Sequence, residues 1–151
     1  MRKKLSVLLA LVLLMGALAV PASAAAPETV YKTETIYVEG LGEVEVETVT
    51  TVHDSLLRSS KKTVETTDKY KSGGTVIATV TLKATFGYDG SDAWVESASV
   101  TKSTSGGWSY GNQSIDKDGG TVTLTAKLTN SPYPSIPVEI TMTCSPSGKI
   151  S

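Results

Sequence analysis

The chain has 151 residues, of which 14 are basic and 15 acidic, so its formal net charge at pH 7 is −1. It carries no extended basic block, so it lacks the cluster of positive charge by which a surface binds nucleic acid or anionic lipid. One cysteine and one histidine cannot form an internal disulfide or a zinc site. The composition therefore leaves a mildly acidic domain of ordinary size with no metal centre of the Cys/His type.

The N-terminus has the layout of a secretory signal peptide. A basic start (Arg2, Lys3 and Lys4) precedes an apolar run over residues 5–20, and the small triplet 22–24 supplies an A-x-A cleavage site. The apolar run is shorter than the roughly 20 residues that a membrane-spanning helix needs. We therefore expect a signal helix over residues 1–24, cleaved near Ala24, and an exported mature protein with no membrane segment.

The next segment predicts a β-hairpin. Residues 29–38 and 43–52 flank a glycine-containing turn, and valines alternate with glutamates in the second arm. The polar stretch 53–62 that follows is either a linker or one helical turn through Leu56 and Leu57. We assign residues 25–60 to an N-terminal hairpin and linker, and the sequence leaves open whether the hairpin joins the main sheet.

The remainder of the chain has the alternation of half-buried antiparallel strands. Apolar residues recur at every second position over 75–86, 121–129 and 136–144, with threonine on the opposite side. Weaker strands are expected over 63–70, 93–101 and 108–115, and glycine-rich turns separate most of them. The chain therefore predicts an all-β fold: an antiparallel, immunoglobulin-like β-sandwich of seven or eight strands, with residues 61–151 as the sandwich domain.

No combination of residues predicts catalysis. The one histidine, His53, lies in a polar segment, whereas Cys144 shares an apolar face with Ile140 and Met142 and should be buried. Three glutamates in a row (Glu43, Glu45 and Glu47) should form a solvated strand face rather than a paired acid site.

Calcium is the remaining metal to consider. The turns at 89–92 and 116–119 each carry only two carboxylates, and an aspartate in a hairpin turn usually accepts hydrogen bonds from its own backbone. The sequence therefore predicts no catalytic residue, no bound metal and no cofactor.

Aromatic side chains are the most plausible binding determinants. Four of them lie in or beside predicted loops, where rings on a β-sandwich can stack on sugars: Trp108, Tyr110, Tyr88 and Tyr133. Trp108 is equally compatible with a core position. We expect Trp94 to be buried, because it appears in register with Ala98 and Val100.

Residues 75–92, the strand Glu96-Ser97-Ala98-Ser99-Val100 and the tail 141–151 resemble a family of small exported proteins from Gram-positive, clostridia-like bacteria. The shared tail pattern is Thr-Cys-Ser followed by a glycine and a final serine. Some members carry a second cysteine near the position of Val95, and its absence here implies that Cys144 forms no disulfide. The resemblance implies a bacterial source and export, and it implies no activity.

Three functional hypotheses follow. The first is a non-catalytic secreted module that binds cell-wall glycan or a surface protein, using loops on a rigid scaffold. The second is a self-associating structural protein, since flat threonine-rich strands have edges that can pair. The third is an enzyme or inhibitor whose site the sequence does not reveal. Neither nucleic acid nor membrane is expected as a partner, and the oligomeric state is left open.

Overall fold

A computed structural model describes residues 26–54 and 60–151, so the predicted signal helix and the possible turn through Leu56 and Leu57 lie outside the described residues. The described part contains eight strands: β1 (Glu28–Val38), β2 (Gly42–Asp54), β3 (Lys61–Ser72), β4 (Thr75–Tyr88), β5 (Ala93–Thr104), β6 (Ser109–Asp118), β7 (Thr121–Thr129) and β8 (Ile136–Thr143).

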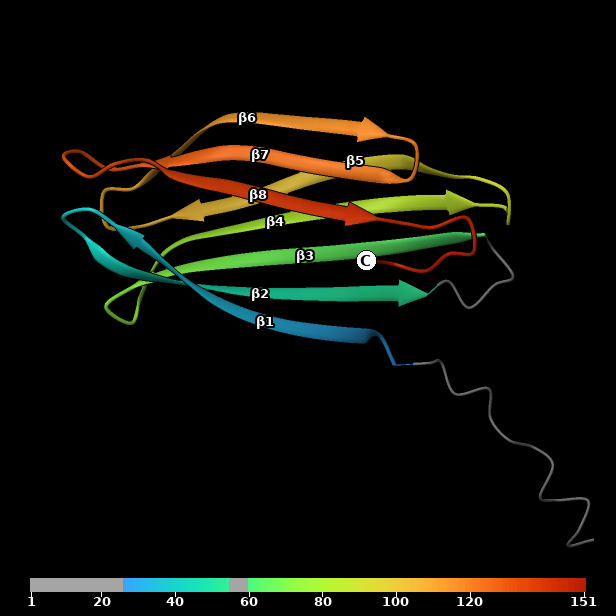
Figure 1. The fold of residues 1–151 in the computed structure, drawn as a ribbon, viewed down its shortest axis with the longest axis horizontal. Helices are drawn as coiled ribbons and strands as arrows, with labels where there is room; N and C mark the ends of the chain where they lie inside the picture. The colour runs from blue at the N-terminus through green and yellow to red at the C-terminus, as the bar shows by residue number, and fades with distance from the viewer. Residues whose placement is uncertain (1–25, 55–59) are drawn as a thin grey trace, which may run out of the picture.

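The strands form two antiparallel sheets, which confirms the predicted all-β sandwich. One sheet has the order β1-β2-β3-β4-β5 and the other the order β6-β7-β8 (Figure 1). Strand order follows the chain in both sheets, so each sheet is a simple meander. The chain crosses from one sheet to the other once, between β5 and β6.

The N-terminal hairpin belongs to the larger sheet. β2 pairs with β3 along nearly its whole length, from Val44 opposite Ser72 to Asp54 opposite Lys62. Residues 26–54 therefore share one sheet with the segment that follows them, and the hairpin is part of the sandwich rather than an addition to it.

The apolar faces of the two sheets pack together as the alternation predicts. On β4 and on the three-stranded sheet, the inward positions are almost completely buried: Val80, Leu82, Ala84, Phe86, Val122, Leu124, Leu128, Ile136, Val138, Ile140 and Met142. Cys144 is a free thiol in the same core, as expected. Burial raises the pKa of this thiol, which disfavours the reactive thiolate.

The two sheets differ in width, and this leaves part of the larger one uncovered. β6 and β7 pack on β5, β7 also contacts β4, and β8 lies over β3. β1 and β2 extend beyond the edge of the smaller sheet (Figure 1). The inner face of these two strands, at the end where β1 begins, is therefore open to solvent between the sheets.

The prediction that Trp94 lies in the core is wrong. The β4–β5 register shifts between Thr85 and Phe86, where Glu96 is an extra residue on β5. Such a bulge reverses the side to which the following side chains point. Trp94 therefore lies on the outer face, 41 % exposed, with its ring over Gly87, where no room is left for a Cβ atom.

Replacing Leu82 with alanine tests the core assignment. Leu82 is fully buried between the sheets, so Leu82→Ala should lower the free energy of unfolding by about 2–5 kcal/mol. Ser99→Ala, on the exposed face of β5, should change it by no more than about 0.5 kcal/mol. Urea unfolding followed by circular dichroism measures both values, and equal effects would contradict the packing.

Candidate binding groove

The predicted aromatic site residues do not meet on one surface. Trp108 is only 6 % exposed and stacks on Tyr133, with ring centroids 6.3 Å apart and planes 11° from parallel. Tyr133 also lies 3.7 Å from where a Cβ on Gly40 would be. These two rings close the end of the sandwich that contains the β1–β2 turn, so Trp108 is a core residue.

The other two rings lie elsewhere. Tyr110 is half-buried near the β5–β6 side, where the Lys102 ammonium lies 4.9 Å from its ring centroid. Tyr88 lies at the opposite end of the sandwich, against Gly148. Successive connections between antiparallel strands alternate between the two ends of the sandwich, so Tyr88, at the end of β4, and Trp108, after the end of β5, lie at opposite ends. Of the four predicted residues, only Trp108 and Tyr133 contact each other.

The polar groups singled out in the sequence are held in structural interactions. His53 lies on the outer face, where its Nε2 is 3.9 Å from a carboxylate oxygen of Glu65. Cys144, in contrast, is buried in the core. Lys71 bridges Glu45 and Glu47 on the same outer face, as expected of a solvated strand. Within residues 26–54 and 60–151, no three His, Cys, Asp or Glu side chains gather to form a metal-binding group.

Asp89 has the turn role that its position predicts. Its carboxylate accepts hydrogen bonds from the backbone N–H groups of Ser91 and Asp92, both at 2.8 Å. These bonds hold the pKa of Asp89 below its usual value.

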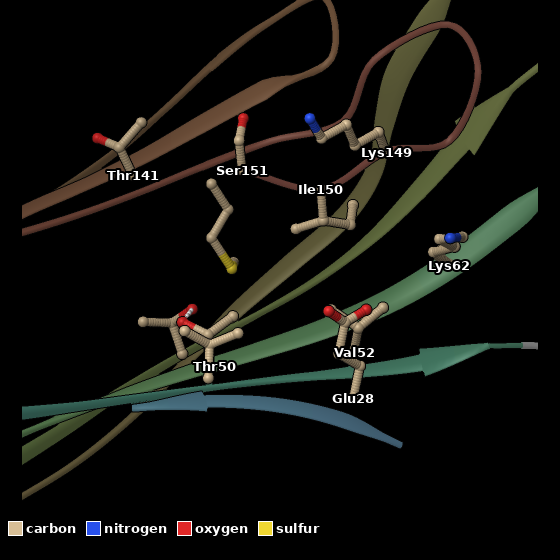
Figure 2. A pocket seen from close by; sticks show the side chains of 11 residues that line it. Glu28, Thr50, Val52, Lys62, Thr141, Lys149, Ile150 and Ser151 are labelled. Carbon is tan, nitrogen blue, oxygen red and sulfur yellow. Dashed lines mark hydrogen bonds between the residues drawn. The ribbon is translucent and has the colours of Figure 1, made fainter. Parts of the chain in front are cut away.

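The candidate site is a groove that sequence reasoning missed. It has a volume of about 420 Å³ and lies where β1 and β2 extend past β8, beside the C-terminal segment (Figure 2). Apolar, hydroxyl-bearing and charged residues line it: Val30, Val52, Met142 and Ile150; Thr50, Thr66, Thr141 and Ser151; and Glu28, Lys62 and Lys149. Thr141 lines it with its backbone, because its hydroxyl bonds to Thr123 on the outer face. Thr50 and Thr66 are joined by a hydrogen bond of 3.0 Å on its floor.

One wall of the groove is the outer edge of β8. The N–H and C=O of Thr143 both bond to Ser151, whereas the N–H of the next residue, Cys144, bonds to Gly120 on the β7 side. Because these directions alternate along a strand, the backbone groups of Glu139 and Thr141 also point away from β7. β8 is the last strand of its sheet in the described part of the chain, so no strand lies beside those groups.

A buried carboxylate lies on the same inner face. Asp68 of β3 is 6 % exposed and accepts a hydrogen bond of 2.7 Å from the Thr48 hydroxyl. Burial raises the pKa of Asp68, and the charge of Glu34 on β1 adds to this effect, whereas the Thr48 hydrogen bond and Lys32 oppose it.

Comparison with protein families, with curated proteins and with solved structures finds no match to this chain. The described residues include no helix long and apolar enough to cross a membrane. The function must therefore be argued from the geometry of the groove.

Replacing Asp68 with asparagine tests the buried charge. Because the folded state raises the pKa of Asp68, folding costs nothing for this group below its unfolded pKa. The cost grows as pH rises from the unfolded pKa to the folded pKa and is constant above the folded pKa. Asp68→Asn keeps an acceptor for Thr48 and removes the charge, so the variant should be more stable than the wild type at pH 7, with the difference vanishing near pH 3.

Urea unfolding at pH 3, 5 and 7 measures this difference. Asp116→Asn, on the exposed strand β6, is the control for loss of one negative charge. A variant that is less stable than the wild type at pH 7 would contradict the assignment of Asp68 as a destabilising buried charge.

Proposed function

We propose that this protein is an exported, non-catalytic binding module whose ligand is an extended polypeptide segment of an extracellular or cell-surface protein. The segment lies in the groove and adds a strand to the free edge of β8. The observation that carries this proposal is the outer edge of β8 at Glu139 and Thr141, beside which no strand lies in the described part of the chain, and Thr141 lines the groove.

Strand addition needs free donors and acceptors in regular spacing. Because the backbone groups of successive residues point to opposite sides of β8, its outer edge presents an N–H and a C=O at both Glu139 and Thr141, and a C=O at Pro137. Proline has no N–H to offer, and edge strands are where it is tolerated. The pairing of Ser151 with Thr143 shows that the neighbouring part of this edge already accepts a strand-like segment.

The width of the opening favours a single strand over the edge of another folded domain. The larger sheet extends past β8 by two strands, which corresponds to about 10 Å at the usual strand spacing. An extended segment fits this space. A second sandwich docking edge-on to β8 would place its own lower sheet against β1 and β2.

The lining indicates the ligand's side chains. Val30 and Val52 alternate with the hydroxyls of Thr50 and Thr66 on the floor of the groove, so small apolar and hydroxyl side chains are favoured at the inward positions of the ligand. None of the described residues that line the groove is aromatic. The glycan alternative would instead use exposed rings on the outer face, such as Trp94.

A proline at position 141 tests the proposal. Decapeptides selected by phage display on the mature chain, which begins at Ala25, serve as probes and are titrated into ¹⁵N-labelled protein. We expect amide shifts centred on Glu139 and Thr141. Thr141→Pro removes one N–H that faces the groove and should weaken binding about tenfold or more, the effect of losing a hydrogen bond of about 1.4 kcal/mol.

Two variants keep this test independent of misfolding. Thr141→Val retains the backbone N–H and changes only a side chain on the outer face, so it should bind as the wild type does. Thr50→Lys places a charge on the groove floor and should abolish binding while β8 is intact. Peptides that bind all four proteins equally would overturn the site. Binding to isolated cell walls or a glycan panel, with no peptide bound, would favour the glycan alternative.

A further inference from the structure

β1 is an edge strand that the rest of the molecule barely covers. Of its eleven residues only Val38 is buried, and it exposes three large side chains: Val30 at 57 %, Tyr31 at 75 % and Tyr37 at 78 %. One side of its backbone pairs with β2, and the other side has no strand beside it in the described part of the chain. A long exposed edge of this kind is a template for pairing with another strand.

We propose that two copies of this chain pair through β1, antiparallel, about a two-fold axis that passes through Thr33. In this register Lys32 faces Glu34 of the second copy, and Glu34 faces the second Lys32. Val30 of each copy faces Ile36 of the other. The proposal concerns a different edge from the peptide site and does not depend on it.

The charges select this register. Lys32 and Glu34 already form an exposed ion pair of 2.9 Å within one chain, with side-chain exposures of 69 % and 51 %, so both groups are accessible to a second copy. Moving the axis to residue 32 or to residue 34 would place lysine opposite lysine or glutamate opposite glutamate. Like charges directly opposite each other destabilise a strand pair, whereas opposite charges stabilise it.

The faces of the strand also match. In the register centred on Thr33, every residue faces one that points to the same side of the sheet, so the two inner faces remain continuous. On the outer side, Tyr31 faces Thr35 of the second copy and Tyr37 faces Thr29. The result is a ten-stranded sheet whose exposed tyrosines and valines are partly covered.

Among the described residues, no strand lies against the free edge of β1. The three-stranded sheet stops at β8, which lies over β3, so the inner side of β1 is open over the half that contains Glu28 and Val30 (Figure 1). At its other end, Val38 is buried in the core. In the pair, the two smaller sheets lie on the same face, and β1 and β2 of both copies lie between them. The grooves of both copies then open onto one shared trough, with Glu28 and Val30 of one copy beside Ile36 and Val38 of the other.

Disulfide trapping tests the register directly. Opposed residues in an antiparallel pair have Cα atoms about 4.5–5.5 Å apart, within the range that a disulfide spans. Thr33→Cys should therefore yield a covalent dimer under mild oxidation. In Thr35→Cys the two introduced thiols would be separated by four residues, about 13 Å, and should not cross-link. Cys144 is buried in all variants and supplies the same background.

Sedimentation equilibrium tests the charges. The wild-type mature chain should dimerise at micromolar to submillimolar concentration. Lys32→Glu alone and Glu34→Lys alone should each weaken the dimer about tenfold or more, and the double charge swap should restore it. Lys117→Glu, on β6, is the control and should leave the dimer unchanged. Circular dichroism confirms that each variant is folded.

Two results would overturn the proposal. One is a wild-type chain that remains monomeric up to several hundred micromolar, together with a lack of cross-linking in Thr33→Cys. The other is a dimer that neither single charge reversal weakens, or that Thr35→Cys traps as efficiently as Thr33→Cys, because either outcome would place the contact elsewhere.

Discussion

The backbone N–H and C=O groups of a β-strand need hydrogen-bond partners, and the last strand of a sheet leaves those on its outer edge without a neighbouring strand. In this fold the two packed sheets also differ in their number of strands. A five-stranded sheet packs against a three-stranded one, so the inner face of β1 and β2, at the end where β1 begins, is not covered by a strand of the described smaller sheet. The edge of β8 ends over β3 for the same reason. The groove and the free β8 edge beside it are consequences of this mismatch, since a fourth strand beside β8 would remove both.

The sequence predicts the core of this architecture well, because period-two alternation directly encodes which side of a strand is buried. Leu82, Leu124 and Ile140 lie inward as expected. Trp94 does not, because a single extra residue at Glu96 reverses the alternation, and no sequence signal marks that bulge. The hairpin was predicted from its pattern, but its attachment to β3 depends on a long-range register that local patterning does not encode.

The candidate site was less predictable than the fold. Their position near loops makes the aromatic residues the binding determinants that the sequence favours, yet Trp108 and Tyr133 stack on each other to close one end of the core. The groove is lined instead by valines, threonines and the strand edge at Thr141, residues that are unremarkable in sequence. One signal was present: Pro137 sits in an otherwise regular strand, and proline there indicates an edge. Which groups face that edge follows only from the sheet order.

Residue-resolved amide hydrogen exchange of the chain from Ala25 to Ser151, at low micromolar concentration, tests this account most directly. If β8 is a free edge, the amides of Glu139 and Thr141 should exchange about a hundredfold faster than those of Ile140 and Met142, which face β7. Equal protection of all four amides would contradict the account, because it would mean that the outer edge of β8 is already covered.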